Sequence, residues 1–146
     1  MTCPARRLRA AVAAPILFVC LFRVEAGEAA EPPRCRPPLD PWAQVELYLG
    51  RGLGGDAVVS EEAFQDFLAE EVTPRFPDGL SVVDVAGQFR DSEGTIVREP
   101  TKLLILLVPD AAGVARKVAT IIEAYKERFD QQSVLHAEQP VCVAFS

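Results

Sequence analysis

Residues 101–109 read TKLLILLVP, and the six residues from Leu103 to Val108 are all aliphatic. A strand with no polar residue on either face must be covered on both sides, so we expect it in the centre of its sheet. The stretch is too short to span a membrane, and Pro109, which has no N–H to donate, marks its end. We therefore assign a central strand here and place the other segments around it.

The N-terminus has the three regions of a secretory signal peptide. Residues 1–9 hold three arginines, residues 10–22 are apolar and uncharged, and a small-residue pattern ends at Ala26. This order predicts a leader over residues 1–26 and an exported protein. The apolar run is shorter than the roughly 20 residues of a membrane-spanning helix, so we expect no transmembrane segment in the mature chain.

Cys20 offers an alternative in which the leader is cleaved before this cysteine and the chain is lipid-anchored. Phe18 and Val19 are bulky where small residues are needed for that processing. We therefore favour a periplasmic or secreted protein without an anchor.

Composition limits the classes of partner. The 146 residues are 49% hydrophobic and 25% charged, as in one soluble globular domain. The formal net charge is -6; removing residues 1–26 takes away four arginines and one glutamate, which leaves 11 basic and 20 acidic residues. So acidic a body argues against a nucleic-acid partner.

The rest of the chain alternates between strand and helix patterns. Residues 27–41 contain five prolines and are expected to form an extended arm. Helices are expected after the caps Ser60 and Asp110, where apolar residues recur at helical spacing. A bulge or kink is expected at Pro100. Four segments have strand patterns: residues 42–49, 80–90, 95–108 and 133–145.

The resulting order is β-α-β-β-α-β, the ferredoxin-like arrangement, over residues 42–146. It predicts an α+β fold with a four-stranded antiparallel sheet and two helices on one face. The first and third strands are central in this topology, which suits the doubly apolar run. The fourth strand lies at an edge, where Pro140 is tolerated.

Two cysteines remain after the leader, Cys35 and Cys142. The fourth strand runs antiparallel to the first, so the topology brings Cys142 close to the start of the first strand and within reach of Cys35. We predict one disulfide, with two unrelated thiols as the alternative. For loops of about 100 residues the chain-entropy model gives an upper value of about 4.7 kcal/mol.

Several phrases resemble a known family. They are VELYLG at 45–50, VTPRFPDGL at 72–80, GQFRD at 87–91, IVREPTK at 96–102, YK at 125–126 and VC at 141–142. Together they resemble the bacterial family catalogued as domain of unknown function 3574, over residues 35–146. The resemblance implies a small exported protein, with some lipoproteins among its members, and no activity that carries over to this chain.

The helices leave one face of the sheet uncovered. We expect Leu103, Ile105 and Leu107 to lie under the helices. The open face is then expected to present these residues: Trp42, Gln44, Glu46, Tyr48, Asp84, Gln88, Arg90, Lys102, Leu104, Leu106 and Val108. An apolar patch of this kind marks an interface or a ligand groove, and related folds often close it with a second copy.

Few residues are candidates for a catalytic or ligand-binding role. Glu46 and Arg90 are candidates for an anion-binding or acid–base pair, although a polar interface is the favoured interpretation. Arg75, in a turn between two prolines, is a candidate clamp for an anion, or a tie to a backbone carbonyl. His136 is the only histidine and is expected to point to the open face. We expect no metal and no cofactor.

These observations favour an exported, noncatalytic binding or interaction module that forms a homodimer through its open face, with an unknown small molecule or protein as a further partner. The alternative is a small-molecule enzyme of the dimeric α/β-barrel type. It would use Glu46, Arg90, Tyr48 or His136 in a cavity under the same face. The ligand candidates are Glu46, Tyr48, Arg75, Gln88, Arg90, Lys102 and His136.

Overall fold

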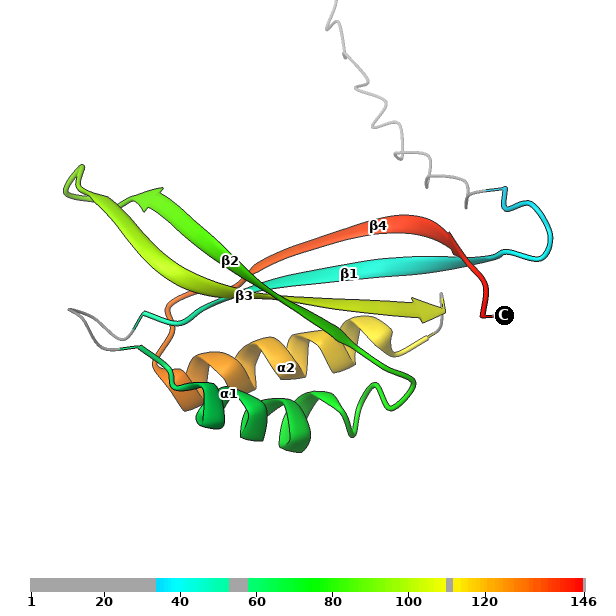
Figure 1. The fold of residues 1–146 in the computed structure, drawn as a ribbon, viewed down its shortest axis with the longest axis horizontal. Helices are drawn as coiled ribbons and strands as arrows, with labels where there is room; N and C mark the ends of the chain where they lie inside the picture. The colour runs from blue at the N-terminus through cyan, green and yellow to red at the C-terminus, as the bar shows by residue number, and fades with distance from the viewer. Residues whose placement is uncertain (1–33, 53–57, 110–111, 146) are drawn as a thin grey trace, which may run out of the picture. The chain divides into compact units, whose positions relative to one another are not determined.

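The computed structural model describes residues 34–52, 58–109 and 112–145. In chain order the elements are β1 (Asp40–Gly50), α1 (Glu61–Phe67), η1 (Leu68–Val72), β2 (Ser81–Arg90), β3 (Ile96–Pro109), α2 (Val114–Phe129) and β4 (Leu135–Val143) (Figure 1). η1 is one π-helical turn that continues α1. The predicted β-α-β-β-α-β fold is confirmed, while the predicted leader lies outside the described residues.

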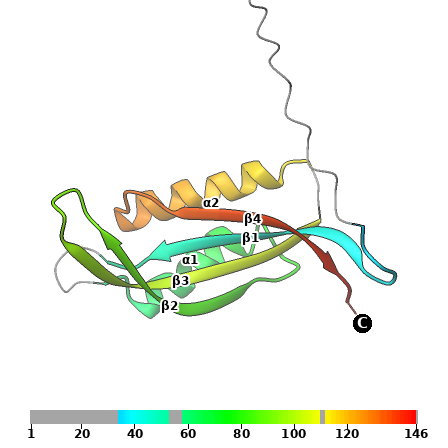
Figure 2. The same cartoon turned by 90° about the horizontal axis from the view of Figure 1, so that it is seen from above.

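The sheet is antiparallel throughout, with the strand order β2-β3-β1-β4. Figure 2 shows α1 and α2 against one face and the other face without a covering element. β3 is central and β4 is an edge, as predicted. Pro100 stands opposite Ala86 in an uninterrupted register, so the bulge expected at this proline is wrong; the hairpin of β2 and β3 instead curves away from the helices (Figure 1).

The helix ends follow local signals. Ser60 Oγ accepts a hydrogen bond from Ala63 N at 3.1 Å and caps α1. α2 begins after Gly113, whose φ of 100° lies in the left-handed region that glycine adopts without strain. The cap predicted at Asp110 lies outside the described residues. In the part of the chain that the structure describes, no helix has the length and apolarity needed to cross a membrane.

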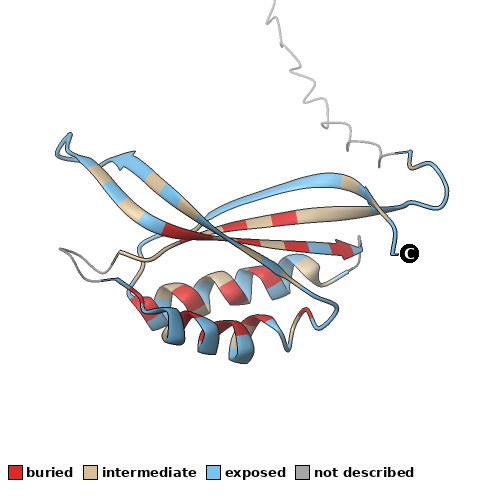
Figure 3. Ribbon diagram, viewed as in Figure 1, coloured by how far each residue is buried: buried red, intermediate tan, exposed pale blue. Residues whose placement is uncertain are grey.

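The core lies between the sheet and the two helices. Phe67 and Tyr125 meet edge to face at 5.1 Å between ring centroids. Figure 3 shows the buried residues concentrated on the strands and helix faces that meet. The most buried side chains are Val45, Leu47, Leu49, Phe64, Phe67, Val72, Leu104, Leu106, Val118, Ile121 and Tyr125.

The face assignment of β3 predicted from the sequence is wrong. Leu104, Leu106 and Val108 lie under the helices and are buried, whereas Leu103, Ile105 and Leu107 point to the open face. The register decides this orientation, because Leu104 stands opposite Leu47 and Leu106 opposite Val45. A strand that is apolar on both sides takes its orientation from its neighbour.

The predicted disulfide is present. Cys35 is bonded to Cys142, with 5.5 Å between the Cα atoms. Cys142 stands opposite Pro41 in the β1–β4 register. The bridge therefore fastens the arm before β1 to the end of the edge strand.

Candidate functional site

The uncovered side of the sheet is built from alternate residues of all four strands. We call it the open face. It is defined by the residues that share a side with Glu46 in the strand register: Asp40, Trp42, Gln44, Glu46, Tyr48 and Gly50 on β1; Ser81, Val83, Val85, Gly87 and Phe89 on β2; Val97, Glu99, Thr101, Leu103, Ile105, Leu107 and Pro109 on β3; and Leu135, Ala137, Gln139, Val141 and Val143 on β4.

Many side chains of the open face are apolar and exposed to solvent. Leu107 on the central strand is 39% exposed, Val83 and Phe89 on β2 are 45% and 51% exposed, and Leu135 on β4 is 63% exposed. Exposed apolar side chains gathered on one face of a sheet are the usual mark of an interaction site.

Polar groups on β1 form a short line beside the apolar surface. Gln44 Nε2 donates to Glu46 Oε1 at 2.6 Å, and the Tyr48 hydroxyl donates to Glu46 Oε2 at 3.1 Å. The hydrogen bond to the Glu46 carboxylate raises the pKa of Tyr48 above its usual value. A hollow of about 110 Å³ lies at this line, next to Ala137 and Gln139.

The charges of the open face are of one sign. Asp40, Glu46 and Glu99 supply carboxylates, and none of the strand residues that define this face is a lysine or an arginine. A carboxylate without a basic neighbour on the same face attracts cations from solution or from a partner.

Four candidates predicted for the open face lie on the opposite side of the sheet. Asp84, Gln88, Arg90 and Lys102 share the side of Leu104 in the register. Glu46 and Arg90 are therefore not a pair across the open face. The Arg90 guanidinium instead donates to the Gly94 carbonyl at 3.1 Å, within its own hairpin.

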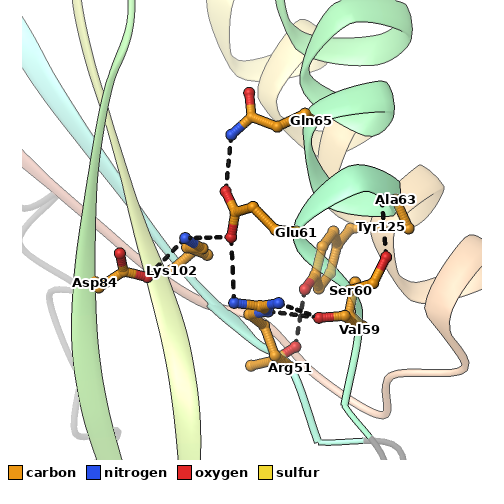
Figure 4. Close-up of polar contacts among 10 residues, drawn as sticks. Arg51, Val59, Ser60, Glu61, Ala63, Gln65, Asp84, Lys102 and Tyr125 are labelled. Atoms are coloured by element: carbon orange, nitrogen blue, oxygen red, sulfur yellow. Dashed lines mark hydrogen bonds and ion pairs between the residues drawn. The ribbon is translucent and has the colours of Figure 1, made fainter.

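Lys102 is the centre of a polar network under the start of α1 (Figure 4). Its residue surface is only 4% exposed, and its Nζ lies 2.6 Å from Asp84 Oδ1 and 2.8 Å from Glu61 Oε2. The same Glu61 oxygen lies 3.4 Å from Arg51 Nη1. Lys102 Nζ also lies 5.5 Å from the centroid of the Phe64 ring. The four charged groups balance to zero.

The network keeps the lysine charged. Hydrogen bonds to Asp84 and then to Glu61 raise the pKa of Lys102, and the bond from Lys102 is the main cause that lowers the pKa of Glu61. A nucleophilic lysine needs a lowered pKa, so this amine is held in its unreactive form. The arrangement joins α1 to β2 and β3.

Sequence reasoning missed two neighbours of this network. Arg51 Nε donates to the Val59 carbonyl at 2.7 Å and ties the residue after β1 to the residues just before α1. The Tyr125 hydroxyl donates to the Gly50 carbonyl at 2.8 Å, and burial raises the pKa of this tyrosine well above its usual range. Neither contact carries a sequence signal, because the partners are joined only by the tertiary fold.

The two remaining candidates have local partners. Arg75 Nη1 donates to the Glu71 carbonyl at 2.5 Å and lies 2.9 Å from Glu71 Oε2, so it ties the turn to the preceding helix. His136 Nε2 lies 2.9 Å from Glu138 Oε1 on the helix side of the edge strand β4. The orientation predicted for His136 is therefore wrong. Within residues 34–52, 58–109 and 112–145, no group of three or more potential metal ligands gathers.

A family model described as "Protein of unknown function (DUF3574)" matches residues 44–145. The chain belongs to this family. The match begins within β1 and covers the other strands and both helices; it confirms the predicted resemblance, over a span that starts nine residues later than residue 35. No curated protein matches the chain.

Solved structures share the fold at low sequence identity. A phage SAM lyase in complex with S-methyl-5'-thioadenosine is 17% identical, with a TM-score of 0.56 over 71% of this chain and 90% of that chain. The same kind of lyase in the apo state is 18% identical, with a TM-score of 0.51 over 72% and 90%. CPII from Thiomonas intermedia K12, bound to ADP, AMP and acetate, is 17% identical, with a TM-score of 0.41 over 73% and 92%. At these identities the likeness to the two lyase structures concerns the fold alone.

Proposed function

We propose that this chain is an exported, noncatalytic interaction module whose open face binds a basic, apolar surface of another protein. The observation that carries the proposal is the composition of that face, an exposed apolar surface with carboxylates and no basic strand residue. Apolar burial supplies the driving force for association, and the carboxylates select a cationic partner.

Export is supported by the chemistry of the disulfide. A structural bridge between Cys35 and Cys142 is stable in an oxidising compartment and rare in a reducing cytosol. The signal-peptide pattern over residues 1–26 points the same way.

The other occupants of the open face receive less support. Two copies packed face to face would bring Glu46 and Glu99 of each copy against an equally acidic surface, which is unfavourable. For an enzyme, the hollow of about 110 Å³ beside Glu46 is well below the roughly 300 Å³ of small ligand pockets. Both remain outcomes that the experiment distinguishes.

The experiment uses two synthetic peptides as probes, one alternating leucine with lysine and the other alternating leucine with glutamate. Titration calorimetry is expected to show binding of the leucine–lysine peptide and at least about tenfold weaker binding of its acidic counterpart. Leu107→Lys should weaken the binding about tenfold, because it places a cation in the apolar part of the open face.

Val58→Lys is the matched control. Val58 is 46% exposed and lies outside the open face, and the substitution adds the same charge. Equal binding of the two peptides, or equal losses for Leu107→Lys and Val58→Lys, would contradict the proposal. A stable dimer that Leu107→Lys alone dissociates would replace it with face-to-face self-association.

A further inference from the structure

The strand β2 forms one edge of the sheet and is ten residues long. Natural edge strands are usually protected from pairing by short length, proline, bulges or charged side chains, above all lysine. β2 contains neither proline nor lysine, and Val83 and Phe89 on it are large and exposed. The opposite edge, β4, includes Pro140, which has no N–H to donate. The two edges therefore differ in their capacity to pair with another strand.

The sequence of β2 is complementary to itself when two copies run antiparallel. If the two-fold axis passes between the two Gly87 residues, Asp84 of each copy stands opposite Arg90 of the other. In the same register Val85 stands opposite Phe89. Opposite charges, and an aromatic side chain facing a β-branched one, are favourable cross-strand pairs. Every such pair occurs twice in a symmetric dimer.

The two residues of each pair lie on the same side of the sheet, as opposite residues in neighbouring strands must. Asp84 and Arg90 lie on the helix side, and the Asp84 side chain is 79% exposed although one oxygen contacts Lys102. Val85 and Phe89 lie on the open face. In this register Gly87, which has no side chain, lies between the two Phe89 rings. A Cβ added to Gly87 would lie 2.9 Å from Thr101 Oγ1.

Neighbouring registers lose these pairs. An axis at Ala86 places Arg90 opposite Val82 and Asp84 opposite Gln88. An axis at Gln88 places Arg90 opposite Ala86. Only the Gly87 register keeps both charge pairs, and it brings no like charges face to face.

We propose that two copies of this chain join along their β2 edges, antiparallel about Gly87, to form one continuous eight-stranded sheet. This inference goes beyond the proposed function. It leaves the open face of each copy accessible and places the two faces side by side on one surface.

Paired cysteine variants test the register. Ala86 and Gln88 are exposed and stand opposite each other across the proposed interface. Under mild oxidation, a mixture of Ala86→Cys and Gln88→Cys proteins should form a cross-linked dimer on a non-reducing gel, whereas each variant alone should form little. The protein used begins after the predicted leader and so lacks Cys3 and Cys20, and Cys35 and Cys142 are bonded to each other. Cross-linking of one variant alone, or no cross-link in the mixture, would overturn the register.

Sedimentation equilibrium tests the interface itself. The wild-type protein should be a dimer, and Phe89→Lys should raise the dissociation constant about tenfold or more, because each dimer loses two Phe89–Val85 pairs. Ile96→Lys is the matched control, since Ile96 is 46% exposed on the same hairpin but lies on β3. A monomer at all concentrations or a ring of three copies would refute the proposal. Leu107→Lys should leave this dimer intact, so the proposal and the proposed function fail separately.

Discussion

The two faces of the central strand β3 are made of the same aliphatic residue types but have different surroundings. Leu104 and Leu106 are fully buried under the helices. Leu107, the residue after Leu106, is 39% exposed on the open face. The polar residues on the two faces of the sheet also have different surroundings. Lys102 on the covered side is held by two carboxylates, whereas the Glu46 carboxylate on the open side accepts hydrogen bonds from Gln44 and Tyr48 of its own strand. One face holds the fold together, and the other remains available for binding.

The largest expected difference between the faces concerns the leucines of β3. Leu104→Ala should lower the free energy of unfolding by about 3 kcal/mol, because it leaves a cavity in the core. Leu107→Ala should lower it by less than about 1 kcal/mol, because this side chain is already partly in water. Urea unfolding measures both changes, and equal losses would show that β3 is oriented differently.

A smaller difference is expected for the two tyrosines. Tyr125→Phe removes the buried hydrogen bond to the Gly50 carbonyl and should cost about 1.5 kcal/mol. Tyr48→Phe removes a bond to Glu46 on the open face, where water replaces it, so the cost should be clearly smaller. Thermal unfolding compares the two variants directly. A larger loss of stability for Tyr48→Phe than for Tyr125→Phe would show that the open face contributes more to stability than the covered face.

The charged residues should differ least. Lys102→Met removes both ion pairs, but Asp84 and Glu61 are 79% and 51% exposed and regain water, so the loss should be about 1 kcal/mol. Glu46→Gln on the open face should leave stability unchanged. Urea unfolding at neutral pH measures both variants, and a clear loss for Glu46→Gln would assign a structural role to the open face.

The stability advantage of the wild type over Lys102→Met should also depend on pH. The pKa of Glu61 is lowered from 4.5, so its contribution is present above that pH and is lost as the pH falls through the folded value. The pKa of Lys102 is raised from 10.5, so its contribution is present below that pH and is lost as the pH rises through the folded value. Unfolding curves across this window should show a plateau between the two limits. A constant difference at all pH values would rule out the ion pairs as its source.

The element order and the disulfide were predictable from the sequence. Strand and helix periods gave the order, and the order alone brought Cys35 close to Cys142. The orientation of β1 was also predictable, because its apolar residues alternate with Gln44, Glu46 and Tyr48. For β3 the same approach failed, since a strand apolar on both sides contains no information about which side faces the helices.

The error on β2 has a different cause. Asp84, Gln88 and Arg90 were assigned to the open face on the assumption that polar side chains face water there. The hairpin curves away from the helices (Figure 1), so its helix side is exposed as well and accommodates them. Likewise, the network around Lys102 required a contact with Glu61, 41 positions earlier, that no local pattern announces.

Methyl NMR of the leucines and isoleucines of β3 shows whether the open face is the binding surface. On addition of the leucine–lysine peptide, the methyl signals of Leu103, Ile105 and Leu107 should shift. Those of Leu104 and Leu106, one residue away on the covered side, should remain in place. Shifts confined to Leu104 and Leu106, or signals that do not move at all, would show that the open face is not the binding surface.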